Sequence, residues 1–407
     1  MLRKKAFYII ILFTLLLVDC TTTSKTIKQT SKTEPTTEQK PETEPQVKRD
    51  KNTITLLFAG DIMAHSVNYK ITSYDKIWRD VKVYISEPDL AFANIEAPID
   101  TTKGALSYPN FNMTQKYVQA AVDAGFDVFS LCNNHSNDQL KNGILETIKT
   151  TQTITKETKE KSGNDIYFSG LKETPEAPLT FNYFEVNDWK ILFLPITELL
   201  NRPTASGYIN FIKPTDEARK DFQKYITELR EENPCDLFII SLHTSEPEYV
   251  RTITKKQNAY YMSLLEAGAD IVWANHAHII KDRKIIVDTQ TGRDKLIMYA
   301  NGNTISGQRT KPDFTSANPN DERENTGDGL LYKVTLHKGK DGSLKIQKCE
   351  SQFITTYINT AYEYVIKPLN QEFIDYLKGV PRNDWAKYIE RRIKIDKEQT
   401  KDLIEWQ

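Results

Sequence analysis

Four of the six histidines in this 407-residue chain lie at or just after the ends of short apolar runs of β-strand composition. They are His135, His243, His276 and His278. Carboxylate and amide side chains end other runs in the same way: Asp61, Glu96 and Asn134. Imidazole, carboxylate and amide groups form a mixed nitrogen and oxygen ligand set, which suits manganese, iron or zinc. The pattern therefore predicts a centre for one or two divalent metal ions.

The spacing of His276 and His278 bears on how many ions this centre holds. One residue separates the two histidines. In an extended chain this spacing puts both imidazole rings on the same side, whereas on a helix the rings would diverge. Each histidine could then bind one ion of a close pair, or both could share one ion.

Three further side chains could join the same centre: Asn94, His65 and Asn303. His65 comes four residues after Asp61, so it could face the same crevice or lie on the surface. His337 falls in the alternating stretch 331–337, which is typical of a strand, and we expect it on a strand face away from the centre.

Asp138 follows His135 by three residues, at the start of a predicted helix over 138–151. At this spacing a carboxylate can accept a hydrogen bond from the imidazole and orient it. The same carboxylate could instead cap the helix N-terminus, and the two roles are compatible.

The elements that would position these side chains alternate along the chain. Strand-like runs occupy 53–59, 90–93, 126–132, 237–242, 268–274 and 296–300. Helical patterns lie between several of them, at 138–151, 214–232 and 255–267. Alternation of this kind predicts an α/β fold. In open α/β sheets the carboxyl ends of the strands face the ligand crevice, so the candidate ligands should converge on one site.

The composition is that of a folded, soluble enzyme or binding protein. Hydrophobic residues make up 39% of the chain and charged residues 27%, which excludes global disorder and a polytopic membrane protein. The 54 basic residues nearly balance the 55 acidic ones, so no nucleic-acid partner is expected. Four cysteines without a CxxC pair exclude a disulfide scaffold and an all-cysteine zinc site.

The first 20 residues have the pattern of a secretory signal. Arg3, Lys4 and Lys5 precede a largely apolar stretch over 6–18, whose 13 residues are too few to span a bilayer. Residues 17–20 resemble a bacterial lipobox, in which Cys20 would be lipidated. We therefore expect a protein anchored by lipid to the extracytoplasmic face of the cell membrane, with an uncleaved N-terminal anchor as the alternative.

The rest of the chain divides into a linker, a main domain and an extension. Nine threonines lie in 21–50, with almost no apolar residues, which predicts a disordered linker over 21–52. The ligand motifs define a domain over 53–335. After it, 345–358 reads as one strand, and an amphipathic helix opens at Asn383. We expect residues 336–407 to pack on the domain as an extension.

The ordered series of motifs resembles the CapA-type capsule (poly-γ-glutamate) synthesis protein family, which belongs to the calcineurin-like metallophosphoesterase superfamily. The resemblance covers roughly residues 53–335. It is carried by 60–63, 94–98, 133–135 with Asp138, His243, 268–270 with His276 and His278, and 299–303.

This resemblance implies a four-layer α/β/β/α sandwich with a metal centre at the strand ends and a C-terminal strand and helix extension. The metal ligands would be Asp61, Glu96, Asn134, His243, His276 and His278, with Glu96 or Asn94 bridging two ions. His135, held by Asp138, would protonate the leaving group of the substrate. The superfamily implies a phosphoester substrate, and the family name implies a γ-glutamyl polymer.

The chain departs from the family pattern at several positions. Met63 stands where the superfamily's first motif has a histidine, so one metal position is short of a ligand and a single ion is an open alternative. Thr244 and Ser245 follow His243 in place of Trp and Gly, and Asn275 and Ala277 also differ. These changes affect loops that would face the substrate and spare the imidazoles.

Two hypotheses follow. The first is a metal-dependent hydrolase of the cell envelope in capsule or poly-γ-glutamate synthesis, acting on an anionic polymer or a phosphoester. The second is a non-catalytic lipoprotein that holds an anionic polymer or scaffolds a capsule export complex. The complete ligand set favours the hydrolase, and Met63 with the changed loops favours the binding protein.

Overall fold

The computed structural model of the protein describes residues 50–407. The predicted signal segment over 1–20, the lipidation site Cys20 and residues 21–49 of the predicted linker lie outside the described residues. Within the described part, no helix is both long and apolar enough to cross a membrane.

The first of two sheets contains eight strands in the order β14-β13-β12-β1-β2-β3-β4, with β11 paired to β1. Strands β1 to β4 are parallel to one another, and β12, β13 and β14 continue the sheet in antiparallel fashion. Their bounds are β1 (Thr53–Ile62), β2 (Leu90–Ile95), β3 (Val128–Ser130), β4 (Tyr167–Ser169), β11 (Asn303–Ile305), β12 (Asp328–Lys338), β13 (Leu344–Ile358) and β14 (Tyr364–Pro368).

The second sheet contains seven strands in the order β15-β9-β10-β8-β7-β6-β5. Its central strands β6, β7, β8 and β10 are parallel, so their carboxyl ends lie at one edge. The bounds are β5 (Asn182–Val186), β6 (Trp189–Thr197), β7 (Leu237–His243), β8 (Ile271–Asn275), β9 (Arg283–Val287), β10 (Lys295–Met298) and β15 (Asp402–Trp406).

The two sheets pack face to face, because side chains alternate between the two faces of each strand. Phe58 of β1 and Phe92 of β2 lie 5.8 and 6.3 Å from Trp273 of β8, measured between ring centroids. Their neighbours in sequence point to the other face, where they pack on helices. A continuous apolar core therefore joins the sheets.

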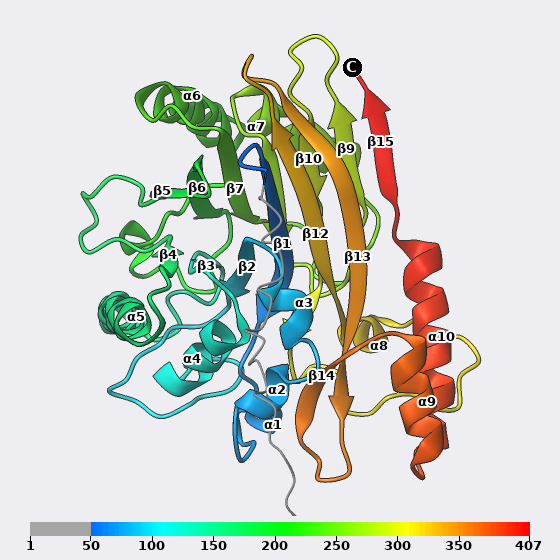
Figure 1. Cartoon of the computed structure of the whole chain (residues 1–407). Helices are drawn as coiled ribbons and strands as arrows, with labels where there is room; N and C mark the ends of the chain where they lie inside the picture. The colour runs from blue at the N-terminus through cyan, green and yellow to red at the C-terminus, as the bar shows by residue number, and fades with distance from the viewer. Residues whose placement is uncertain (1–49) are drawn as a thin grey trace, which may run out of the picture. The chain divides into compact units, whose positions relative to one another are not determined.

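Helices cover the outer faces of both sheets (Figure 1). Helices α2 (Asp75–Trp78), α3 (Lys82–Ser86), α4 (Gln115–Ala124) and α5 (Leu140–Ser162) share a buried cluster with the first sheet. Helices α6 (Asp216–Glu232) and α7 (Lys255–Glu266) share one with the second. This arrangement confirms the predicted four-layer α/β/β/α sandwich.

Helix α5 differs most from its predicted extent. It runs for 23 residues instead of ending near residue 151. Its second half is rich in threonine and lysine, whose low apolar content hides the helical period in the sequence. Thr151, Ile154 and Thr158 are nevertheless buried against neighbouring elements. Tertiary packing thus extends the helix beyond what local preference indicates.

The C-terminal part of the chain is built into both sheets. Residue 335, where the extension was expected to begin, lies inside β12. The predicted strand is β13, and the predicted helix is α10 (Asn383–Gln399). Helix α9 (Gln371–Gly379), α10 and β15 follow one another along one edge of the sandwich, at the right of Figure 1. Strand β15 pairs with β9, so residues after 335 extend the first sheet and then the second.

A buried ionic network ties α10 to the start of β12. The Asp328 carboxylate accepts hydrogen bonds from Arg392 at 2.5 Å and from Arg309 at 3.0 Å. Burial alone would raise the pKa of Asp328, but the Arg392 and Arg309 guanidinium groups hold this pKa below its ordinary value. Arg392 also donates to the Asn325 side chain at 2.9 Å. The network therefore fixes the chain that precedes β12 to the C-terminal helix.

We expect Arg392→Ala to lower the free energy of unfolding, because it leaves the Asp328 carboxylate with one guanidinium fewer in the interior. Removal of one partner of a buried ion pair costs about 3–5 kcal/mol. Urea denaturation measures the change. The control is Lys394→Ala on the same helix, whose side chain is 74% exposed. This control should change stability by less than about 1 kcal/mol. An Arg392→Ala protein as stable as the control would contradict the role of the network.

Candidate metal centre

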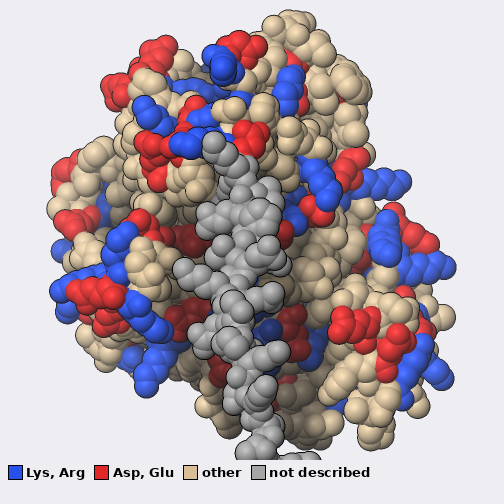
Figure 2. Space-filling model, viewed as in Figure 1, with Lys and Arg blue, Asp and Glu red and all other residues tan. Residues whose placement is uncertain are grey.

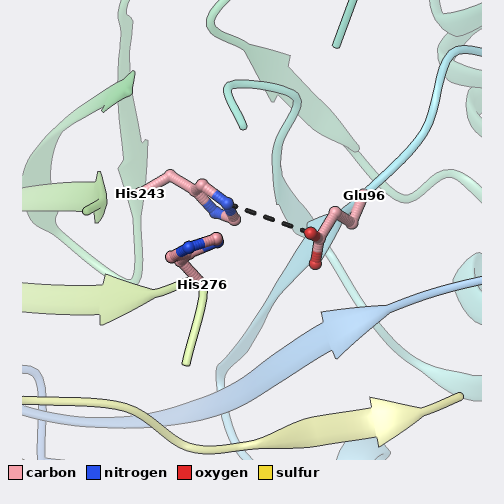
Figure 3. A group of neighbouring side chains, drawn as sticks. All are labelled: Glu96, His243 and His276. Carbon is pink, nitrogen blue, oxygen red and sulfur yellow. Dashed lines mark ion pairs between the residues drawn. The ribbon is translucent and has the colours of Figure 1, made fainter. Parts of the chain in front are cut away.

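The candidate ligands meet where strands of both sheets end. Asp61 is the second-last residue of β1, and Glu96 directly follows β2. His243 is the last residue of β7, and His276 directly follows β8. Figure 3 shows His243 and His276 pointing toward Glu96, which comes from the opposite sheet. The face-to-face packing of the sheets therefore assembles the centre.

Gly60 allows β1 to reach this position. The chain at Gly60 lies so close to the turn before β11 that a Cβ atom would come within 1.8 Å of the carbonyl oxygen of Gly302. The Asp61 amide donates a hydrogen bond to that same oxygen at 3.1 Å. Any side chain at residue 60 would therefore move the Asp61 carboxylate away from the centre.

Two groups of ligand atoms lie close enough to hold an ion. Glu96, His243 and His276 offer atoms within 4.8 Å of one another, and so do Asp61, Glu96 and His278. Glu96 belongs to both groups, which is the arrangement expected of a carboxylate that bridges two ions. All five side chains are buried.

The hydrogen bonding of these residues fits a bound cation. Both carboxylate oxygens of Glu96 and the Oδ2 atom of Asp61 are buried and have no hydrogen-bond partner among the described residues. The same holds for the Nδ1 atoms of His243 and His276. A buried polar atom without a partner costs about 1–3 kcal/mol. A divalent ion between these atoms would remove that cost, so the donor set fits a metal.

The electrostatics of the centre also favour a cation. Burial raises the pKa of Glu96 well above its usual value, and the nearby Asp61 carboxylate raises it further. Burial lowers the pKa of His276 to about 3, and it holds the pKa of His243 well below the ordinary value. The imidazoles are therefore neutral at pH 7, the form in which histidine binds a metal. A positive ion would stabilise the ionised form of Glu96.

Asparagine side chains orient the ligands. Asn94 donates to Asp61 Oδ1 at 2.8 Å, and its own oxygen faces Asn133 at 3.3 Å. Asn134 Oδ1 lies 2.8 Å from His243 Nε2, and Asn303 Oδ1 lies 3.0 Å from His278 Nδ1. In this structure Asn94 and Asn303 therefore support neighbouring ligands through hydrogen bonds. Such partners fix the direction and tautomer of a ligand.

The prediction that His276 and His278 lie in an extended chain is wrong. His276 has a φ of 90°, a left-handed conformation that is costly for a residue with a side chain. The chain turns there, and the two ring centroids lie 6.1 Å apart. His276 consequently joins the group of Glu96 and His243, while His278 joins the group of Asp61 and Glu96.

His135 lies beside the centre and is held by Asp138. The His135 Nδ1 atom lies 2.7 Å from Asp138 Oδ2, which also accepts a hydrogen bond from the Phe111 amide at 2.8 Å. Phe111 packs its ring edge against the imidazole, with centroids 4.7 Å apart. Helix α5 is preceded by Gln139 and has no side-chain cap, so the alternative that Asp138 caps this helix is wrong.

The structure places the two remaining histidines as follows. His65 is largely buried and accepts a hydrogen bond from the Gly307 amide through Nδ1 at 3.0 Å. Burial lowers the pKa of His65 to about 3, with a further contribution from His278. His337 lies in β12, as predicted, and its ring is 3.6 Å from Asp50. His65 therefore borders the centre, and His337 does not.

A cavity of about 620 Å³ opens over the centre. Its lining includes Met63, His65, His135 and His278, which connect it to the metal ligands, and the aromatic residues Tyr108, Phe111 and Tyr249. The segment after β11 forms the rest of the wall, with Lys311 and Arg323. A ligand in this cavity could thus contact the His135 imidazole and the ligand cluster together.

Several residues near the centre belong to none of the motifs identified in the sequence. The Asn201 amide lies 3.2 and 3.3 Å from the two nitrogens of His135, and its oxygen faces Asn134 Nδ2 at 3.2 Å. Asn201 and Lys311 lie in loops, and Arg323 lies in the four-residue helix α8 (Glu322–Asn325), which is too short for a periodicity that marks a residue as facing a site. An excess of basic residues in 306–311 could have indicated Lys311 alone, because Arg323 lies among acidic residues in 321–324.

Comparisons with known proteins agree with these observations. The family model of the bacterial capsule synthesis protein PGA_cap matches residues 55–308. Capsule biosynthesis protein CapA of Bacillus anthracis is 26% identical over 278 residues, which are 65% of this chain and 63% of that protein. PGA biosynthesis protein CapA of Bacillus subtilis (strain 168) is 23% identical over 298 residues, 71% of this chain and 73% of that protein. The chain thus spans less than two thirds of the length of the first relative.

A solved structure, the calcineurin-like phosphoesterase YfkN from Bacillus subtilis, superposes with a TM-score of 0.39 at 12% identity. The alignment covers 83% of this chain and 99% of that chain.

The family match covers more than half of the chain and includes the six predicted metal ligands together with His135 and Asp138. The order of motifs in the sequence predicted the same family. The chain belongs to the bacterial capsule synthesis protein PGA_cap family.

Proposed function

We propose that this protein is a metal-dependent hydrolase of the cell envelope that acts in capsule or poly-γ-glutamate synthesis. The observation that carries the proposal is the position of Glu96, which is shared by two ligand groups beside the His135–Asp138 pair. The two relatives are named for capsule and PGA biosynthesis, which supports the biological role. The substrate is a phosphoester or a γ-glutamyl polymer.

The metal is one or two divalent ions of manganese, iron or zinc. It would be held by Asp61, Glu96, Asn134, His243, His276 and His278. When bound, such an ion polarises the electrophilic centre of a substrate and lowers the pKa of water. Three imidazoles and two carboxylates, in two groups that share Glu96, give the borderline ligand set that these metals prefer.

The chain itself contributes proton transfer and orientation. The Asp138 carboxylate faces His135 Nδ1, which leaves Nε2 as the nitrogen that can donate a proton to a leaving group. Phe111 fixes the plane of the ring, and the Asn201 amide borders it. His135 lines the cavity, so a substrate there can reach it.

One observation favours a non-catalytic alternative. Met63 is buried at the edge of the cavity, at the position where the superfamily's motif has a histidine. A centre with one ligand fewer could hold an ion weakly and serve to bind an anionic polymer. In that case the protein would hold the polymer or scaffold a capsule export complex.

We further propose that the protein is anchored through a lipid on Cys20 at the extracytoplasmic face of the cell membrane. The basic start, the short apolar stretch and the lipobox-like residues before Cys20 support this proposal.

His276→Ala and His278→Ala should each reduce the bound metal, because each removes a ligand from a different group of the centre. They should also reduce the rise in melting temperature that added manganese or zinc produces, since an ion that binds only the folded protein stabilises it. His337→Ala is the matched control, because this histidine lies outside the centre. Metal analysis by mass spectrometry is the measurement. Equal metal content in all three variants would exclude the proposed ligands.

His135→Asn should retain the metal but lower turnover by roughly 10²- to 10⁴-fold, the usual contribution of a general acid. The loss should be smaller for nitrophenyl phosphate than for phenyl phosphate, because the nitrophenolate leaving group needs no proton. Asp138→Asn should give a smaller loss with the same dependence on the leaving group.

Steady-state kinetics on metal-loaded protein separates the two functions. The binding-protein alternative predicts no turnover by the wild type. It also predicts that a His135→Asn gene restores capsule or polymer synthesis to a deletion strain as well as the native gene does.

Cys20→Ala should abolish acylation and leave the precursor unprocessed or released from the membrane. Mass spectrometry of the N-terminus and partition between detergent and aqueous phases are the measurements. A wild-type protein that carries no acyl group and enters the aqueous phase would refute the proposed lipid anchor.

A further inference from the structure

Two cations at the cavity wall have no counterion among the residues that the structure describes. Lys311 and Arg323 both line the cavity of about 620 Å³ and are exposed to it. Neither side chain makes an ion pair or a hydrogen bond with any residue that the structure describes. The other basic residue of the lining, Arg309, is paired with Asp328 at 3.0 Å. Lys311 and Arg323 are therefore available to a ligand.

The charge balance of the cavity favours an anion at this wall. Glu248 is the one acidic residue among those that line the cavity. Its backbone carbonyl accepts a hydrogen bond from the His278 amide at 3.0 Å, which places Glu248 beside the ligand cluster. His65 also lines the cavity but is neutral at pH 7, because burial lowers its pKa to about 3. Lys311 and Arg323 thus give the cavity lining two positive charges besides that of the paired Arg309.

The chain as a whole is not basic. On the visible part of the face drawn in Figure 2, basic and acidic side chains are interspersed. The whole chain has a net charge of −1. A general attraction for anions is therefore absent, and the two cations would act on a ligand that has already entered the cavity.

Hydrogen bonds to neighbouring elements hold the residues that flank the two cations. Arg309 is 2% exposed and donates to Tyr388 at 3.0 Å and to Thr355 at 2.6 Å. Glu324, next to Arg323, accepts a hydrogen bond from the Asp313 amide at 2.8 Å. These bonds fix the backbone on both sides of the cations, so less conformational freedom is lost when the side chains bind a ligand.

We propose that Lys311 and Arg323 form a subsite for a second anionic group of the ligand, a carboxylate or a phosphate, whose reacting group lies at the metal centre. The subsite determines specificity and takes no part in proton transfer or metal binding. The inference rests on the proposed function in one respect, namely that the cavity over the metal centre is the ligand site. It requires a ligand with repeated or paired negative charges, and it holds for a hydrolase and for a binding protein alike.

The test uses the double variant Lys311→Gln/Arg323→Gln of the full chain, loaded with manganese. Isothermal titration measures the binding of two probes, a pentameric γ-linked glutamate peptide for carboxylates and tripolyphosphate for phosphates. Loss of two charge-assisted hydrogen bonds should weaken the binding of the matching probe by about tenfold to a hundredfold. Its dependence on salt should weaken as well. The control is Lys340→Gln/Lys387→Gln, which removes the same charge at positions outside the cavity lining.

The outcomes separate this inference from the proposed hydrolase. Weaker binding of one probe to the double variant than to the control, with unchanged metal content, supports the subsite and identifies its anion. Weaker probe binding in a protein that shows no turnover supports the subsite while refuting the hydrolase. Equal affinity of the double variant and the control overturns the subsite. Tight binding to the wild type of a γ-linked isoglutamine peptide, in which amides replace the α-carboxylates, also overturns it. Failure of both probes to bind the wild type also overturns it.

Discussion

The buried carboxylate of Glu96 is the constraint on which the centre depends. It lies in the interior beside Asp61, and its two oxygens find no hydrogen bond among the described residues. A charged pair of this kind is stable in a folded protein only when a cation neutralises it or when one carboxyl takes up a proton. The neutral imidazoles of His243 and His276 provide lone pairs in place of positive charge. The surroundings of Glu96 therefore match a site where a divalent ion completes the fold.

The sandwich architecture follows from the same requirement. The first sheet contributes carboxylates, at the ends of β1 and β2, and the second contributes imidazoles, at the ends of β7 and β8. Neither sheet alone holds a complete ligand group. The aromatic packing of Phe58 and Phe92 on Trp273 keeps the strand ends in register across the core. Changes in that core would therefore displace the ligands of the metal centre.

Most of the sandwich fold and most of the candidate ligands could be predicted from the sequence. Short apolar runs that end in Asp61, Glu96 and His243 identify parallel strands, and the convergence of parallel strand ends is general to such sheets. The positive φ of His276 could not be predicted, because residues with a side chain rarely adopt it and no local motif marks it. The role of Asp138 was open in the sequence, since capping and histidine orientation require the same residue at the same spacing. The position of Asn201 was also hidden, because a loop residue carries no periodic signal.

The region that matches the family model ends within the cavity wall. The match stops at residue 308, directly before Arg309 and the wall segment that carries Lys311 and Arg323. Every metal ligand lies before that point, whereas the residues that anchor the wall, such as Tyr388, lie after it. Mutation can therefore alter the wall without touching the ligands. Paralogues could keep the same metal ligands and differ in this part of the cavity wall.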